Sequence, residues 1–362
     1  MLRGDVKRLN TEYDVIIVGL GPAGVTSLYE LSRLGFKVLG VESSKILANK
    51  PCGEAVPKQL FSTVKINPDE VNSYPVRNVV IDLEGKKKLL QFKSVVGYII
   101  DKRLLLELIV KNAIDEGATT LLGVSVENVE ADGRVKLATG DVIRGQVVIC
   151  SDGVLGPCFR HFKHYTFIGA YQCKAQCRIC EDETLYLYFR RDLTGYMWLF
   201  PKSNNMCNVG VGGLKIKPKH YMEHLLKTLT SKFNLRILRC DGGAIPALGP
   251  IGNVVNGRLI AIGDRAGTAM SFTGEGIRPA IISSIYASKK VREFLDGVSN
   301  SLNYLKEFMK EWGWRIDNSS KMLRMFLKTP GFLRKIVIER LNEKLALKVL
   351  FGETLGLTLK YG

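Results

Sequence analysis

Residues 14–24 read DVIIVGLGPAG, an apolar run that leads into a glycine-rich turn. A helix-like segment, VTSLYELSRLG, follows, and a second apolar run, FKVLGVE, ends in Glu42. This order predicts a strand, turn, helix and strand that bind a dinucleotide, because glycines let the backbone approach a pyrophosphate and a helix N-terminus stabilises its charge. Glu42 would accept a hydrogen bond from a ribose hydroxyl. The residues predicted to contact the cofactor here are Gly19, Gly21, Pro22, Ala23, Gly24, Glu42 and Ser43.

The composition is that of a globular protein with a strong basic excess. The 362 residues allow one large domain or two, with 46% hydrophobic and 24% charged residues. The net charge of +17 suits an anionic lipid or a phosphorylated ligand, unless it reflects an organism-wide basic bias. No zinc-finger or RNA-binding signature occurs, so no nucleic-acid partner is expected. The sequence has neither the apolar core of a signal peptide nor an apolar run of ~18 residues, so we expect a cytoplasmic protein without a transmembrane helix.

Two further glycine-containing motifs follow apolar runs later in the chain. Residues 146–150, QVVIC, precede Asp152-Gly153, and residues 258–262, RLIAI, precede Gly263-Asp264. Gly274, Gly276 and Ile277 then open a segment of helical periodicity that extends to Phe294. A glycine-rich segment that opens a helix can present backbone N–H groups to a ligand.

These three motifs, in this order, resemble the FAD-dependent family that includes p-hydroxybenzoate hydroxylase-like enzymes. The resemblance implies FAD rather than NAD, with the first motif on the ADP half and Asp264 on the ribitol-phosphate side. It also implies that Lys102 or Arg103 contacts the FAD phosphate, although the family usually has Arg at position 102 and a solvated helix start is an alternative. The later residues expected at the cofactor are Asp152, Gly153, Gly263, Asp264, Gly274, Gly276 and Ile277.

Residues 193–202, LTGYMWLFPK, place aromatic residues at alternate positions before a proline. On a strand ending at Pro201, the rings of Tyr196, Trp198 and Phe200 would share one face. Within the flavin family, YxWxFP resembles the geranylgeranyl reductases, whose usual pattern is PxxYxWxFP, and Leu193 replaces the first proline. The resemblance implies hydride transfer from reduced flavin to alkenes of a geranylgeranyl chain, carried on an archaeal-type glycerophospholipid. The rings would form a wall for this chain, the alternative being ordinary core packing.

Residues 50–56, KPCGEAV, follow Glu42 closely, and the resemblance places a Cys-Gly loop beside the flavin. Cys52 is therefore expected to tune flavin reduction, to donate a proton to the alkene, or only to fill a tight turn. The predicted catalytic residues are Cys52, Tyr196 and Trp198, and Cys52 and Gly53 also contact the flavin. The predicted substrate-binding residues are Gly53, Glu54, Tyr196, Trp198, Phe200 and Pro201.

The remaining cysteines and the histidines are expected to bind no metal. Cys173, Cys177 and Cys180 have the C-x3-C-x2-C spacing of an iron–sulfur motif, but they fall within a β-like segment. A cluster, zinc or a disulfide are alternatives to buried thiols, which a cytosolic setting favours. His220 and His224 are read as an exposed helix face.

The chain becomes helical and basic from about residue 300, with Thr329-Pro330-Gly331 separating two helices. Apolar stripes are predicted from Met322, Met325, Phe326, Phe332, Leu333 and Ile336. Two compatible interpretations are a helical cap over the substrate domain and a lid on a lipid tunnel that also rests on an anionic membrane, at the inner face of the cell membrane.

The predicted fold is α/β with α+β elements: an FAD-binding Rossmann-like domain interleaved with an antiparallel β-sheet substrate domain and a C-terminal helical region. The FAD-binding parts are 1–80, 101–160 and 251–298; the substrate parts are 81–100 and 161–250; the helical region is 299–362. The expected partners are an isoprenoid lipid and an external electron donor, which is NADPH, ferredoxin or a deazaflavin. The alternatives are a flavin-dependent monooxygenase or halogenase, and a non-catalytic lipid-binding flavoprotein.

Overall fold

The first large sheet carries the glycine-rich turn. The computed structural model describes residues 10–163, 166–177, 183–202 and 205–353. In these residues the central strand order is β17-β18-β11-β1-β2-β8, and β10 and β9 extend it from β11. Strands β18, β11, β1, β2 and β8 are parallel, as in a dinucleotide-binding sheet. The bounds are β1 Glu12–Val18, β2 Val38–Glu42, β8 Thr119–Leu122, β9 Val126–Val129, β10 Arg134–Leu137, β11 Val142–Cys150, β17 Val255–Asn256 and β18 Leu259–Ala261.

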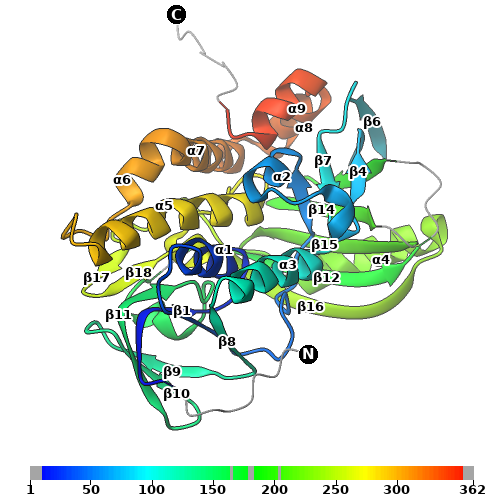
Figure 1. Ribbon diagram of the computed structural model, residues 1–362. Coiled ribbons are helices and arrows are strands. Elements are labelled where there is room, and N and C mark those ends of the chain that lie inside the picture. The colour runs from blue at the N-terminus through cyan, green and yellow to red at the C-terminus, as the bar shows by residue number, and fades with distance from the viewer. Residues whose placement is uncertain (1–9, 164–165, 178–182, 203–204, 354–362) are drawn as a thin grey trace, which may run out of the picture.

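Three helices cover this sheet: α1 (Pro22–Ser32), α3 (Lys102–Asp115) and α5 (Ile277–Leu295). Pro22 stands in the first turn of α1, where its missing N–H costs no helical bond. Asp101 caps α3 by accepting hydrogen bonds from the N–H groups of Arg103 and Leu104. Figure 1 shows α1 beside both α3 and α5, and its apolar side is buried in the main core. The helices predicted after the first and last glycine motifs are confirmed.

The second large sheet has the order β16-β12-β15-β14-β13-β5-β6. Its neighbouring strands are antiparallel, as predicted, except β13 and β5, which are parallel. Helix α4 (Pro218–Phe233) packs on one face through Met222, Leu225 and Leu229. The bounds are β5 Asn78–Leu83, β6 Lys86–Gln91, β12 Phe167–Gln176, β13 Thr184–Phe189, β14 Gly195–Lys202, β15 Met206–Leu214 and β16 Arg236–Pro246.

A small three-stranded sheet has the order β3-β7-β4. In the sequence, β3 and β4 precede β5 and β6 of the second sheet, and β7 follows them. Its strands are β3 (Ala55–Pro57), β4 (Tyr74–Val76) and β7 (Gly97–Ile99), with helix α2 (Gln59–Val64) and the short turn η1 (Pro68–Val71) between β3 and β4. Residues 50–54, here called the Cys52 loop, lie directly before β3. The small sheet therefore fixes one end of this loop.

The C-terminal region is helical, as predicted. It contains α6 (Leu305–Phe308), a π-helical turn η4 (Met309–Gly313), α7 (Trp314–Lys328), α8 (Gly331–Glu339) and α9 (Glu343–Leu350). Pro330 separates α7 from α8, and Figure 1 shows α8 and α9 on the same side of the molecule as β6 and β7. None of the helices within the described ranges has the length and apolar character needed to cross a membrane.

The chain passes repeatedly between the two large sheets. It builds β1 and β2 in the first sheet, β5 and β6 in the second, β8–β11 in the first, β12–β16 in the second, and returns to the first with β17 and β18. This interleaving is what the fold class predicted. The predicted boundary between residues 80 and 81 falls inside β5, and the domain boundaries themselves stay predictions.

Candidate functional site

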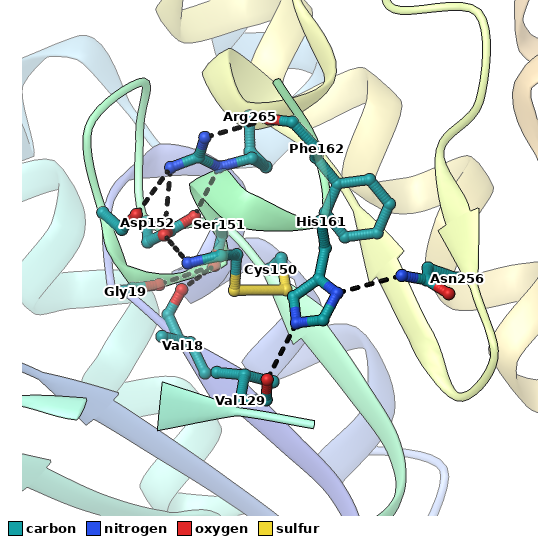
Figure 2. Close-up of a disulfide and its surroundings, with 12 residues drawn as sticks. Val18, Gly19, Val129, Cys150, Ser151, Asp152, His161, Phe162, Asn256 and Arg265 are labelled. Atoms are coloured by element: carbon teal, nitrogen blue, oxygen red, sulfur yellow. Dashed lines mark hydrogen bonds and ion pairs between the residues drawn. A yellow bond between two sulfur atoms is a disulfide. The ribbon is translucent and has the colours of Figure 1, made fainter. Parts of the chain in front are cut away.

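The glycine-rich turn after β1 packs closely against the end of β11. A Cβ on Gly24 would lie 2.0 Å from the Gly19 carbonyl oxygen and 2.8 Å from Ser151 Oγ. Ser151 Oγ donates to the Gly19 carbonyl at 2.7 Å, as Figure 2 shows. A Cβ on Gly21, in contrast, would meet no atom within 4 Å. The turn is therefore tightly packed at Gly24 and open at Gly21. The predicted approach of a pyrophosphate to the N-terminus of α1 at Gly21 stays a prediction.

Glu42 lies at the end of β2, next to the same turn. Its Oε2 accepts a hydrogen bond from Leu20 N at 2.9 Å, and Oε1 accepts from Ser44 N at 2.9 Å and Ser43 Oγ at 3.2 Å. These bonds hold the carboxylate at the carboxyl edge of the sheet. A ribose contact by Glu42 stays a prediction.

Asp152 and Arg265 form a buried clamp between the second and third motifs (Figure 2). Arg265, with 0% exposure, donates from Nε to Asp152 Oδ1 at 2.8 Å and from Nη2 to Asp152 Oδ2 at 3.0 Å. Its Nη1 also donates to the Val154 and Phe162 carbonyls. Both carboxylate oxygens of Asp152 thus accept hydrogen bonds from Arg265, and the predicted contact between Asp152 and the cofactor stays a prediction. Sequence reasoning missed Arg265, whose signal was its place directly after Gly263-Asp264.

Asp264 connects the third motif to the Cys52 loop. Lys50 Nζ lies 2.7 Å from Asp264 Oδ2, and the Lys50 carbonyl accepts a hydrogen bond from Lys102 Nζ at 2.6 Å. Lys102 is buried, whereas Arg103 is exposed and pairs with Glu107 on the surface of α3. Of the two predicted phosphate ligands, Lys102 is the one that points into the junction between these segments.

The third motif also contacts the aromatic strand. Tyr196 donates from its hydroxyl to the Thr273 carbonyl at 2.5 Å, and a Cβ on Gly274 would lie 3.3 Å from that hydroxyl. Gly274 has φ +74°, which suits glycine. Gly276 precedes α5 and, as a glycine, gives this helix no side-chain cap, so its first N–H groups lack the usual capping partner among the described residues.

The Cys52 loop lies across the second sheet and is held by polar side chains. Gln172 Nε2 donates to the Cys52 carbonyl at 2.8 Å, and Asn208 Nδ2 donates to the Gly53 carbonyl at 3.1 Å. Glu54, only 4% exposed, accepts from Asn208 Nδ2 at 2.8 Å and from Lys202 Nζ at 2.5 Å. The Glu54 carboxylate thus anchors the loop to the sheet, and its predicted contact with substrate stays a prediction.

Strand β14 presents the predicted row of rings. The ring centroids of Tyr196 and Trp198 are 5.8 Å apart, and those of Trp198 and Phe200 are 6.0 Å apart. Trp198 packs against Gly210 of β15, where a Cβ would lie 2.0 Å from its ring. Phe200 lies 3.1 Å from the position of a Cβ on Gly53. The row therefore lies against the Cys52 loop at its Phe200 end. At its Tyr196 end it lies against Thr273 and Gly274, here called the Thr273 segment.

Three details of the row bear on its chemistry. Burial, and to a lesser extent the nearby Cys52 thiol, raises the pKa of Tyr196 to about 12, so its hydroxyl keeps its proton at neutral pH. The buried Trp198 Nε1 has no hydrogen-bond partner among the described residues. The strand ends at Lys202 rather than at Pro201 as predicted, and the alternation places Pro201 on the other face from the rings. Substrate binding by Pro201 stays a prediction.

The prediction that the cysteines are thiols is wrong for four of them. Cys150 is bonded to Cys158, as Figure 2 shows, and Cys173 is bonded to Cys240. The second pair joins directly opposite positions of β12 and β16, a register that the sequence does not reveal. Cys52, Cys177 and Cys207 are free, and Cys180 lies outside the described residues. Within the part of the chain that the structure describes, no three His, Cys, Asp or Glu side chains gather as metal ligands.

Comparisons with known proteins match this architecture. Residues 168–245, which contain the aromatic strand, match the family model described as the geranylgeranyl reductase catalytic domain. The digeranylgeranylglycerophospholipid reductase of Methanocaldococcus jannaschii is 26% identical, over 98% of this chain and 95% of that protein. The digeranylgeranylglycerophospholipid reductase 1 of Methanococcoides burtonii is also 26% identical, over 84% of this chain and 80% of that protein.

Solved structures share the fold. A geranylgeranyl bacteriochlorophyll reductase-like protein from Thermoplasma acidophilum has a TM-score of 0.79 at 21% identity, over 94% of each chain. A flavin-dependent brominase variant has a TM-score of 0.74 at 17% identity, over 94% of each chain. The predicted flavoprotein fold and the predicted resemblance to the geranylgeranyl reductases are both confirmed.

Proposed function

Because this chain resembles the geranylgeranyl reductases along nearly its whole length, we propose that it is an FAD-dependent oxidoreductase that reduces carbon–carbon double bonds in the geranylgeranyl chains of archaeal-type glycerophospholipids. One observation carries the proposal: the ring row of Tyr196, Trp198 and Phe200 lies against the Cys52 loop and the Thr273 segment. A long apolar chain without polar handles can be held by such a rigid aromatic surface.

The described residues fit FAD at this place. The open position at Gly21 and the N-terminus of α1 suit the pyrophosphate, and Glu42 suits the ribose. Lys102 and Asp264 stand where the ribitol phosphate would follow, and the uncapped N-terminus of α5 offers further N–H groups. When bound and reduced, FAD supplies a hydride to one alkene carbon.

The protein's own groups would position the alkene and supply the proton. The rings exclude water and hold the chain, which shortens the distance between reacting atoms. The Tyr196 hydroxyl already donates a hydrogen bond to the Thr273 carbonyl, whereas Cys52 is a free thiol. Cys52 Sγ accepts a hydrogen bond from Glu54 N at 3.4 Å, which fixes the thiol. We assign the Cys52 thiol as the acid that donates a proton to the second alkene carbon. Solvent then reprotonates the resulting thiolate.

The electron donor is external in this proposal. The sequence carries one strand, glycine-turn and helix fingerprint, at residues 14–35, and no second one for a separate nicotinamide domain. NADPH, ferredoxin and a deazaflavin stay open as donors. The proposed lipid substrate resides in a bilayer, so we also propose that the protein associates peripherally with an anionic membrane. The net charge of +17 supports this association.

The Tyr196→Phe variant is expected to fold and to lose about five- to tenfold in kcat. It removes one hydrogen bond to the Thr273 carbonyl, worth about 1 kcal/mol, and loosens the rings from the third motif. Tyr221→Phe is the matched control, because its hydroxyl also donates to a carbonyl, that of Asp192, but far from the rings. An unchanged kcat would contradict the positioning role. A loss beyond about a thousandfold would make Tyr196 the proton donor in place of Cys52.

The function is tested by analysing products with and without oxygen. Dithionite-reduced protein should add hydrogen to a digeranylgeranylglyceryl phospholipid under anaerobic conditions, and mass spectrometry should detect gains in steps of two hydrogens. Oxygenated or halogenated products that need O₂ and NADPH would instead support a monooxygenase or halogenase. Tight lipid binding without product would support a non-catalytic lipid-binding flavoprotein.

A further inference from the structure

Helix α8 exposes a continuous apolar row. Phe332 is 65% exposed, Leu333 39%, Ile336 41% and Val337 53%. Their spacing of one, four and five residues places them on one side of the helix. Exposed apolar patches of this kind mark contact surfaces in proteins that are otherwise soluble.

The other side of α8 is anchored by a charged residue. Arg334 is half-buried, donates from Nε to the Thr329 carbonyl at 2.8 Å and lies 4.8 Å from the Phe326 ring centroid. An ordinary surface helix buries its apolar residues and exposes its charges. Helix α8 departs from this, because four apolar residues are exposed while Arg334 is half-buried. The contacts of Arg334 fix the side of the helix that faces the protein.

The surroundings of the row are strongly basic. Residues 324–348 contain seven Lys or Arg against two Glu. Lys328, Arg340 and Lys344 are exposed around α8 and α9. An apolar row flanked by lysine and arginine is the arrangement that binds the interface of an anionic bilayer, whereas a water-soluble partner would have to match the same charge with an acidic surface.

The same helical pair reaches the aromatic row. Leu347 of α9 packs in the cluster that contains Trp198 and Phe200. Polar contacts attach α8 and α9 to strand β6. Lys88 Nζ donates to the Glu339 carbonyl at 2.5 Å, Gln91 N donates to Glu343 Oε1 at 3.4 Å, and Lys86 Nζ lies 3.6 Å from Glu339 Oε1. None of the α9 residues is fully buried. The pair therefore connects the exposed row with the proposed substrate surface.

We propose that α8 is the membrane-contacting element of this protein, with Phe332, Leu333, Ile336 and Val337 inserted into the interface of an anionic bilayer. A lipid chain drawn from that bilayer reaches the ring row past Leu347. The inference rests on the proposed function for the identity of this lipid, but the contact itself can be measured without turnover.

The test is co-sedimentation of the full chain with vesicles of equal parts phosphatidylcholine and phosphatidylglycerol, and with vesicles of phosphatidylcholine alone. The wild-type protein should partition onto the anionic vesicles, and Phe332→Ser/Val337→Ser should lower that partition by at least about tenfold. Lys328→Gln/Lys344→Gln should lower it on the anionic vesicles only. Leu238→Ser/Val298→Ser is the matched control, because these apolar residues are 51% and 77% exposed elsewhere on the molecule.

A wild-type protein that ignores anionic vesicles, or a Phe332→Ser/Val337→Ser variant that binds them equally well, would overturn the inference. A wild-type dimer in sedimentation velocity that this variant abolishes would also overturn it, because the row would then bind a second copy. The variant should reduce detergent-dispersed lipid at the wild-type rate, since α8 is not part of the chemistry. If the wild-type protein binds vesicles but reduces no lipid in detergent, the proposed function fails and the membrane contact stands.

Discussion

The Arg265→Met variant is expected to lose about 3–5 kcal/mol of unfolding free energy and to purify without flavin. Arg265 is fully buried and is bidentate to Asp152, so its removal leaves a buried carboxylate without its counter-charge. It also leaves the Val154 and Phe162 carbonyls without their donor. Because the pair joins the second and third motifs, its loss should separate the segments around the cofactor.

Urea denaturation of the variant and absorbance of the purified protein measure both effects. Arg292→Met is the control, because Arg292 and Asp296 form an exposed pair at 3.3 Å that should contribute less than about 1 kcal/mol. A loss below about 1 kcal/mol in Arg265→Met, with full flavin content, would show that the clamp does not organise the site.

Substitutions of Gly24 and Gly21 should separate the folding of the turn from cofactor binding. Gly24→Ala forces a Cβ to within 2.0 Å of the Gly19 carbonyl oxygen, so we expect a loss of about 1–3 kcal/mol or more and little bound flavin. Gly21→Ala meets no atom within 4 Å, so its unfolding free energy should stay near that of the wild type. Its FAD affinity should nevertheless fall about a hundredfold, or about 2.8 kcal/mol, because the new methyl group occupies the approach of the pyrophosphate.

Thermal unfolding of the flavin-free protein and FAD titration measure these two effects. Gly252→Ala is the neutral control, since it also meets no atom within 4 Å and lies outside the three motifs. Wild-type FAD affinity in Gly21→Ala would contradict the placement of the pyrophosphate at the turn.

Local patterns in the sequence were enough to predict the elements that bear the site. The apolar run before Gly19 and the helical periodicity after Gly276 are both patterns among residues that are close in the sequence. Strand β1 and helix α5 form where these patterns predict them. The alternating rings of β14 likewise follow from a strand period of two residues, which fixes Tyr196, Trp198 and Phe200 on one face.

The connections between distant segments were not predictable, because they depend on register and burial. Cys173 meets Cys240 only through the pairing of β12 with β16. The bonds from Lys202 and Asn208 to the Glu54 carboxylate likewise depend on the fold, because these residues lie 148 and 154 positions from Glu54 in the sequence. Arg265 looked like an ordinary basic residue, and only the three-dimensional structure places it on Asp152.

The central claim is that reduced flavin in this protein passes its electrons to an alkene, and an anaerobic single turnover tests it most directly. The flavin would be reduced with dithionite without excess, a digeranylgeranylglyceryl phospholipid would be added, and the absorbance spectrum and lipid mass would be followed together. We predict that one flavin returns to its oxidised spectrum for every two hydrogens gained by the lipid. A flavin that stays reduced beside lipid of unchanged mass would contradict the assignment.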